Sequence, residues 1–282
     1  MFGRALFASG GAEASSDEGA EAAPRVSLIV PAMNEAENLP HVAAEIPWDI
    51  VDELVFVDGN SSDATAAVAR ELWPGAIHLV QTRKGKGNAL ACGFAAATGD
   101  IIVMIDADGS TSAREIPLFV DALLADADFA KGTRFALGGG SSDITPFRAL
   151  GNRGLNALVN TLFKTRFTDL CYGYNAFWRS ALDVMDLPDI EAAEPQWGDG
   201  FEIETLINIR VAAAGLRISE VPSFESERIH GDSNLNAVTD GMRVLKTIRQ
   251  EKRRRAQAIP APARAARTVP APAAAPSSSA AA

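Results

Sequence analysis

Four short apolar runs alternate with helix-like segments in the first 110 residues, and this alternation limits the fold more than any other feature. The runs are 26–32 (VSLIVPA), 52–59 (DELVFVDG), 76–82 (AIHLVQT) and 100–108 (DIIVMIDAD). Strands that are apolar on both faces are typical of a parallel sheet covered by helices. Because crossovers between such strands are right-handed, their carboxyl ends meet at one rim of the sheet, where ligands bind. The pattern predicts an α/β fold with a mostly parallel sheet.

The second half of the folded region is less regular. We expect strands at 127–135 and 216–226, helices at 146–164 and 198–215, and a strand and turn that lead into a helix at 168–185. Residues 1–24 and 256–282 are rich in Ala, Gly, Ser and Pro and bury too little apolar surface to offset chain entropy. We therefore predict one folded domain over 25–255 between two disordered ends.

The composition excludes several classes of protein. The chain has 282 residues, of which 47% are hydrophobic, and a formal net charge of −10, which argues against a nucleic-acid-binding protein. Cys92 and Cys171 are far apart and lack the spacing of a zinc site, which favours a reduced, cytoplasmic protein. No apolar run reaches the ~18 residues that span a bilayer, so we expect no transmembrane helix.

A polar cluster follows each of the four predicted strands. The clusters are Asn34–Glu35, Asp58–Asp63, Arg83–Asn88 and Asp106–Ser110. Since the carboxyl ends of parallel strands share a rim, we expect the four clusters to converge there.

The last cluster contains two aspartates one residue apart. Asp106 and Asp108 lie on the same side of an extended segment, while Ala107 points away. Two carboxylates this close repel one another, and a cation relieves the repulsion. Oxygen ligands suit Mg²⁺ or Mn²⁺, which a substrate phosphate usually shares. The alternative is a pair of solvated acids in a turn.

Six short segments, in order between residues 26 and 236, resemble the family 2 glycosyltransferases. They are VSLIVPAMNEAENL, ELVFVDGNSSDAT, RKGKGNALACGFAAATGDIIVMIDADGS, KGTRF, TDLCYGYNAF and GFEIETLINIRVAAAGLRISEVPSFESERIHGDSNL. The likeness is greatest to the polyprenyl-phosphate branch, which includes the dolichyl-phosphate mannose synthases. It implies a single GT-A domain with a Rossmann-like sheet. It also implies inverting transfer of a sugar from a UDP- or GDP-linked donor, with Asp106 and Asp108 holding the metal.

The resemblance assigns donor-binding roles to residues after the first two strands. Pro31, Asn34 and Glu35 match the family's first donor-binding loop, and Asp58 matches the acid that binds the base or ribose. The family commonly has a second aspartate where this chain has Gly59. The alternatives are a helix-start turn at residues 34–35 and a helix cap at Asp58.

Basic residues in three further segments match groups that face the donor phosphates in the family. Lys84 and Lys86 lie in a glycine-punctuated loop before a helix, where backbone N–H groups are also placed to hold a diphosphate, although a solvated basic turn is the alternative. Arg134 matches the family's phosphate-facing arginine. Arg228 and Ser233 belong to a loop near the diphosphate, in which Asn234 replaces the usual lysine.

Asp199 and Glu202 are candidate catalytic carboxylates together with Asp108. We expect Asp199 and Glu202 to share one face of the helix at 198–215 because they are three residues apart. A hydroxyl acceptor needs a carboxylate to take its proton, whereas a phosphate acceptor does not. For a phosphate acceptor, these acids would orient the sugar or help to hold the metal.

The last predicted helix has apolar residues at Val238, Met242, Leu245 and Ile248, followed by the basic run 252–255. Such a helix either packs on the domain or lies peripherally on the inner face of the plasma membrane. The expected acceptor is a polyprenyl phosphate, by family likeness, and the alternative is a soluble hydroxyl compound. A sugar-1-phosphate nucleotidyltransferase and a non-catalytic nucleotide-sugar sensor remain further alternatives.

Overall fold

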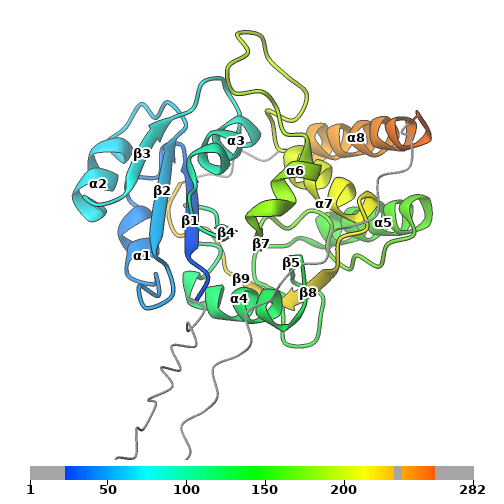
Figure 1. Ribbon diagram of the computed structural model, residues 1–282, viewed down its shortest axis with the longest axis horizontal. Helices are drawn as coiled ribbons and strands as arrows, with labels where there is room; N and C mark the ends of the chain where they lie inside the picture. Colours follow the sequence, from blue (N-terminus) through cyan, green and yellow to red (C-terminus); the bar gives the residue numbers. More distant parts are fainter. Residues whose placement is uncertain (1–22, 232–236, 258–282) are drawn as a thin grey trace, which may run out of the picture. The chain divides into compact units, whose positions relative to one another are not determined.

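The computed structural model describes residues 23–231 and 237–257. The segments 1–24 and 256–282, which we expect to be disordered, lie almost entirely outside the described residues, as does Ser233. The described residues form one α/β unit (Figure 1).

The core is a seven-stranded sheet with the order β3-β2-β1-β4-β7-β5-β8. The strands are β1 Val26–Ala32, β2 Glu53–Asp58, β3 Ile77–Val80, β4 Ile101–Met104, β5 Phe129–Thr133, β7 Asn175–Trp178 and β8 Ile218–Pro222. Only β7 runs antiparallel to its neighbours within this sheet. Two short strands, β6 Gly140–Ser141 and β9 Phe224–Glu225, form a separate pair. The prediction of a mostly parallel sheet is confirmed.

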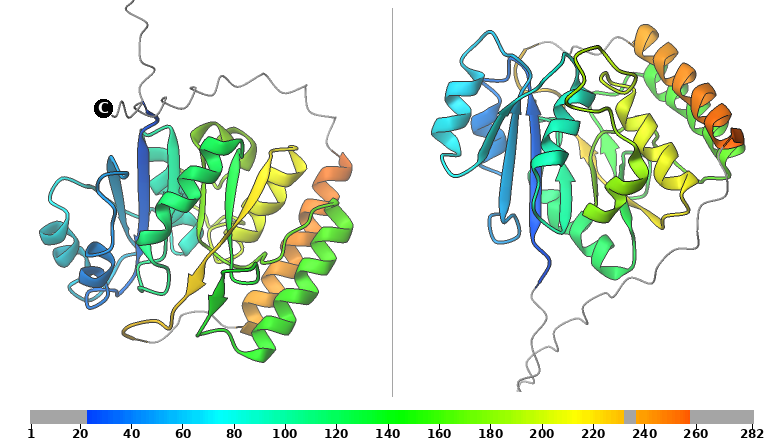
Figure 2. Two further views of the ribbon diagram at one scale, coloured as in Figure 1. Left: turned by 90° about the horizontal axis from the view of Figure 1, so that it is seen from below. Right: turned by 45° about the horizontal axis from the view of Figure 1, so that its top comes forward.

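Helices cover both faces of the sheet because each buried strand turns alternate side chains to opposite sides. Leu28 and Val30 of β1 pack with α1 Leu39–Ala43, α2 Thr65–Leu72 and α4 Ile116–Ala125. Ile29 packs on the other side with α3 Lys86–Ala96, α6 Leu182–Met185 and α7 Ile203–Ala213. Two long helices, α5 Pro146–Phe163 and α8 Ala237–Gln257, lie side by side and pack on α7 (Figure 2).

Two helices begin later than the sequence pattern suggests. The helix after β1 begins at Leu39 and not at the possible helix-start turn at residues 34–35, because Asn34 adopts a left-handed conformation with a φ of 60°. The helix expected at 198–215 begins at Ile203, so Asp199 lies in the turn before it and does not share a helix face with Glu202.

The last helix, α8, has a buried face that consists of Val244, Thr247, Ile248 and Glu251. Of the predicted apolar positions, Ile248 is buried, whereas Met242 and Leu245 are 61% and 40% exposed. Part of the apolar stripe therefore packs on the domain and part of it stays at the surface.

Candidate active site

A pocket of about 1270 Å³ opens at the rim where the parallel strands end. Each of the four polar clusters contributes at least one residue to its wall, as the order of strands and helices predicted. Ten of the predicted site residues line it: Pro31, Glu35, Lys84, Lys86, Asp106, Asp108, Arg134, Asp199, Glu202 and Arg228. The pocket exceeds the ~300–1,000 Å³ of a typical small-ligand site, so it has room for a donor and an acceptor.

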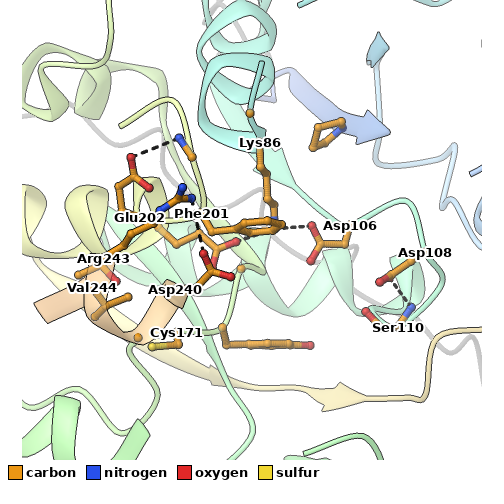
Figure 3. Close-up of a pocket in the computed structure, with 18 of the residues that line it drawn as sticks. Lys86, Asp106, Asp108, Ser110, Cys171, Phe201, Glu202, Asp240, Arg243 and Val244 are labelled. Atoms are coloured by element: carbon orange, nitrogen blue, oxygen red, sulfur yellow. Dashed lines mark hydrogen bonds and ion pairs between the residues drawn. The ribbon is translucent and has the colours of Figure 1, made fainter. Parts of the chain in front are cut away.

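The two aspartates after β4 each have a cationic partner from a distant part of the chain. Lys86 Nζ lies 2.6 Å from Asp106 Oδ1, and the two side chains point toward one another in Figure 3. Arg228 contacts Asp108 at 3.1 Å and also pairs with Glu35. Both ion pairs lie on the wall of the pocket, so the two carboxylates remain at the common rim.

Lys86 stands between two carboxylates because Glu204 of α7 accepts a hydrogen bond from its ammonium group at 2.6 Å. Burial alone would lower the pKa of Lys86, but the charges of Asp106 and Glu204 raise it. Burial raises the pKa of Asp106 to about 6, and the charges of Asp108 and Glu204 add to the rise against the opposing effect of Lys86. Glu204 is not among the site residues selected from the sequence, and nothing in the sequence reveals its contact with Lys86.

The glycines around Lys86 serve a different purpose from the one expected. The N–H groups of Gly87 and Asn88 donate to the carbonyl of Asp199 at 2.8 and 3.1 Å, so these two groups are not available to a diphosphate. A Cβ atom on Gly87 would lie 1.8 Å from the carbonyl oxygen of Gly198. The absence of a side chain therefore lets the start of α3 approach the 198–200 turn.

Asp199 is held by a buried ion pair. Arg83 donates to both carboxylate oxygens, at 2.9 and 2.8 Å, and the backbone N–H of Gln196 donates to one of them. Burial opposes ionisation of Asp199, but the hydrogen bonds from Arg83 outweigh it and lower the pKa. This ion pair anchors the 196–200 segment to the loop before α3, a partnership that the sequence did not reveal.

Glu202 differs from Asp199 because one of its oxygens is left without a partner. Oε1 accepts from the N–H groups of Gly198 and Gly200 at 3.0 and 3.3 Å. Oε2 is buried and has no hydrogen-bond partner among the described residues. Glu202 therefore keeps an unused hydrogen-bond acceptor beside the pocket that its other atoms line.

Arg134 has carboxylate partners on two sides. It donates two hydrogen bonds to Asp169, at 2.6 and 2.8 Å, and two to Glu225, at 3.0 and 2.9 Å. Burial lowers the pKa of Arg134, but these carboxylates raise it overall. The guanidinium group therefore joins the turn before β7 to β9, and a phosphate would have to displace these contacts.

Asn34 and Asp58 do not line the pocket. The carboxylate of Asp58 accepts from the N–H of Ser61 at 3.2 Å, and the amide oxygen of Asn34 accepts from the N–H of Ser62 at 2.8 Å. Both side chains thus shape the loop after β2. Gly59 of that loop lines the pocket together with Gln81, which the sequence reasoning did not select.

The charges on the pocket wall are unbalanced. Of the described residues that line it, ten are Asp or Glu and six are Lys or Arg, which gives a formal charge of −4. The described residues contain no group of three or more His, Cys, Asp or Glu side chains arranged to hold a metal by themselves. Two carboxylates on a negatively charged wall fit Mg²⁺ or Mn²⁺ with its remaining ligands from substrate phosphate and water.

The end of the pocket formed by α5 and α8 is apolar. Phe147 and Leu155 of α5 and Met242 and Leu245 of α8 line it, and Phe147 is 69% exposed. Arg148 and Arg243 lie beside these apolar groups, with Asp143 and Asp240 as their partners. None of the helices among the described residues is both long enough and apolar enough to span a bilayer.

Comparisons with known proteins agree with this geometry. Residues 27–185, more than half of the chain, match the model for glycosyl transferase family 2. A polyprenol monophosphomannose synthase of Mycolicibacterium smegmatis is 30% identical over 221 residues, 75% of this chain and 81% of that protein. An undecaprenyl-phosphate mannosyltransferase of Micrococcus luteus is 30% identical over 80% of this chain and 93% of its own length.

A solved structure has the same fold. Glucosyl-3-phosphoglycerate synthase of Mycobacterium tuberculosis, in complex with Mn²⁺, UDP and glucosyl-3-phosphoglycerate, superposes with a TM-score of 0.62. The two proteins are 25% identical, and the match covers 80% of this chain and 79% of that one. The strand order, the pocket at the sheet rim and the similarity to these proteins lead to one conclusion: the chain is an enzyme that belongs to glycosyl transferase family 2.

Proposed function

We propose that this enzyme transfers a sugar from a UDP- or GDP-linked donor to a polyprenyl phosphate, with inversion at the anomeric carbon and with Mg²⁺ or Mn²⁺ at Asp106 and Asp108. The observation that carries the proposal is the acidic turn after β4, which lies in one pocket with Lys86, Arg228 and an apolar wall. Family membership counts against the nucleotidyltransferase alternative and the sensor alternative.

The charge of the pocket supports a metal requirement. A nucleotide-diphospho-sugar is an anion, and a wall with a formal charge of −4 repels it. A divalent ion at Asp106 and Asp108 supplies positive charge to the diphosphate as its bond to the sugar breaks. The synthase from M. tuberculosis that shares the fold was solved with UDP and either Mn²⁺ or Mg²⁺.

We assign the phosphate-facing roles to Lys86 and Arg228. Both are within reach of Asp106 or Asp108, and each exchanges a carboxylate for a donor phosphate when the site is occupied. Lys84, Pro31 and Glu35 form the neighbouring wall. Asn34 and Asp58 do not contact the donor in this proposal. They stabilise the loop after β2, whose Gly59 lines the donor site.

Arg134 and Asp199 have structural roles in this proposal, although the sequence made them candidates for contact with the substrate. Arg134 and Asp199 both have their charges satisfied by buried partners, so we propose that they hold the pocket wall in place and do not contact the substrate. Ser233 lies outside the described residues and keeps its expected role near the diphosphate.

The acceptor assignment depends on the wall formed by α5 and α8. A polyprenyl phosphate combines an anionic head with an apolar chain, and this wall combines Arg148 and Arg243 with exposed apolar side chains. The phosphate oxygen is already anionic and attacks the anomeric carbon without a general base. Two relatives are named for polyprenol or undecaprenyl phosphate, which agrees with this assignment.

We also propose that the enzyme contacts the inner face of the plasma membrane from the cytoplasm. The exposed face of α8 carries Met242 and Leu245 followed by Arg249 and Arg253. An apolar face with basic residues binds anionic lipid surfaces.

One observation favours a second acceptor class. The unpartnered Oε2 of Glu202 would accept the proton of a hydroxyl group, which a phosphate acceptor does not require. A soluble hydroxyl acceptor therefore remains the second candidate.

The test is a panel of UDP- and GDP-sugars, each incubated with Mn²⁺ and either undecaprenyl phosphate in detergent or a mixture of soluble sugars and polyols. The readout is release of the nucleoside diphosphate and the mass of the product. We expect release only with the lipid phosphate, abolished by EDTA. Release with soluble hydroxyl compounds alone would transfer the assignment to the second candidate, and EDTA-resistant release would refute the metal site.

A further inference from the structure

Four groups from opposite ends of the chain form a closed ring of hydrogen bonds beside the acidic turn. Asn38 donates to Glu35 Oε2 at 2.6 Å and to the carbonyl of His230 at 3.1 Å, and it accepts from the N–H of His230 at 2.9 Å. Arg228 donates to the same carbonyl at 2.8 Å and pairs with Glu35. Asn38 is thus linked to Arg228 in two ways, through the carboxylate of Glu35 and through the backbone of His230.

Asn38 occupies a position at which an asparagine side chain normally caps a helix. It is the N-cap residue of α1, yet its side chain makes no capping hydrogen bond. It is only 2% exposed, and its amide group is used on a segment 192 positions away in the sequence. Capping of α1 therefore does not account for an amide side chain at this position.

The segment held by Asn38 lies across the acidic turn. The N–H of Ser226 donates to the carbonyl of Ser110 at 2.8 Å, and the N–H of Ile229 donates to the carbonyl of Asp108 at 3.3 Å. Between these two contacts, Arg228 reaches Asp108 through its guanidinium group. Residues 226–231 are thus fixed to the turn at one end and to Asn38 at the other.

We infer that Asn38 is a positioning residue, which holds the backbone of His230 and the carboxylate of Glu35 so that Arg228 reaches the donor diphosphate. The inference rests on the proposed function, because it takes Arg228 as a group that faces phosphate. Without the amide of Asn38, the backbone of His230 loses its two hydrogen bonds to Asn38 and Glu35 loses a donor. His230 then keeps only its contact with Arg228 from this ring, so Arg228 samples orientations away from the pocket.

The chain provides a matched control. Asn160 holds the backbone of Phe167 in the same two-bond manner, with its amide nitrogen 2.8 Å from the carbonyl of Phe167 and its amide oxygen 2.8 Å from the N–H of Phe167. Neither Asn38 nor Asn160 lines the pocket. Asn160→Ala therefore removes an equivalent clamp without touching the donor site.

The first measurement is hydrogen–deuterium exchange of the full chain. In Asn38→Ala and in the isosteric Asn38→Asp, we expect exchange in a peptide covering 226–231 to rise about tenfold, because each lost buried hydrogen bond weakens the closed state. Asn160→Ala should raise exchange around Phe167 and leave 226–231 unchanged. Unchanged exchange at 226–231 in both Asn38 variants would overturn the inference.

The second measurement is calorimetric binding of UDP and of GDP, each with Mn²⁺. For whichever nucleotide binds, we expect the dissociation constant to rise about tenfold in both Asn38 variants and by at least as much in Arg228→Gln. Asn160→Ala should bind this nucleotide with the affinity of the unmodified enzyme. Normal binding in the Asn38 variants, with weakened binding in Arg228→Gln, would reduce Asn38 to a structural role. Normal binding in Arg228→Gln would instead refute the role that the proposed function gives to Arg228, whatever the exchange data show.

Discussion

The carboxylates of the acidic turn are already paired with cationic side chains in the free enzyme. Asp106 and Asp108 do not share one cation; each has its own, Lys86 or Arg228. A buried charge without a partner is unfavourable, and these pairings remove that penalty in the free enzyme. In the proposed function, the same cations would become available to phosphate if the two carboxylates held a metal ion.

Replacement of Asp108 tests this arrangement directly. Asp108→Asn removes a proposed metal ligand and one of the two carboxylate partners of Arg228, so we expect nucleotide release to fall by more than about a hundredfold. The melting temperature should change little, because Asp108 is partly exposed. Asp183→Asn, on the exposed side of α6, is the control and should retain full activity. Near-normal turnover in Asp108→Asn would contradict the metal assignment.

The pH dependence of metal binding follows from Asp106. Its pKa is raised to about 6, so a proton competes with the metal below that pH. We expect Mn²⁺ affinity, measured without nucleotide by electron paramagnetic resonance, to fall by up to about tenfold per pH unit below about 6 and to be constant above it. In Asp106→Asn this dependence should disappear. A flat affinity between pH 5 and 7 in the unmodified enzyme would contradict the prediction.

The start of α3 and the 198–200 turn form the most tightly packed contact between elements of the site. Their backbones meet where Gly87 has no side chain, and Asp199 accepts two N–H groups of α3 through its carbonyl while its carboxylate holds Arg83. This contact places Lys86 opposite Glu204. Glycine at position 87 therefore positions a lysine, although it binds nothing itself.

A pair of glycine substitutions separates this packing effect from helix propensity. Gly87→Ala places a Cβ atom 1.8 Å from the carbonyl oxygen of Gly198, and we expect a loss of about 3 kcal/mol in the free energy of unfolding. Gly154→Ala, within α5, has no atom within 4 Å and should gain about 0.5–1 kcal/mol. Urea denaturation measures both. Equal effects of the two substitutions would show that the contact at Gly87 is not tight.

Some helices and strands could be predicted from the sequence more fully than others, for physical reasons. The strands β1, β2 and β4 are buried on both faces, so their parallel direction follows from the sequence pattern. The sequence left two placements open for α8, and only part of its apolar stripe is buried, because its packing face also includes the polar residues Thr247 and Glu251. The buried Glu251 has a cationic partner in Arg210 of α7, a contact that sequence periodicity does not reveal.

The whole molecule joins two environments in one pocket. The sheet rim supplies charged groups, and α5 and α8 supply an apolar wall that opens to the surface. The exposed face of α8 continues this wall, since residues 242, 245, 249 and 253 recur at helical spacing. An anionic lipid with a long chain would meet both environments at once.

Binding to lipid vesicles tests this arrangement. We expect co-sedimentation with vesicles that contain anionic lipid, and about 30-fold weaker binding in the double variant Arg249→Glu/Arg253→Glu, at about 1 kcal/mol per basic residue. The double variant Arg70→Glu/Arg114→Glu makes the same change in net charge on α2 and next to α4, and it should bind normally. Equal loss in both double variants would indicate a general charge effect and not a docking face.

The sequence alone determined the alternation of strands and helices along the first half of the chain, the rim at which the polar clusters meet and the acidic turn after β4, because these follow from local periodicity and from the handedness of crossovers. Only the tertiary structure decided the partners of these groups. Lys86 with Glu204, Arg83 with Asp199 and Asn38 with His230 join residues more than 100 positions apart. A side chain's identity sets which bonds it makes, but the packing of distant elements sets which partner lies within reach, and that packing is a property of the whole fold.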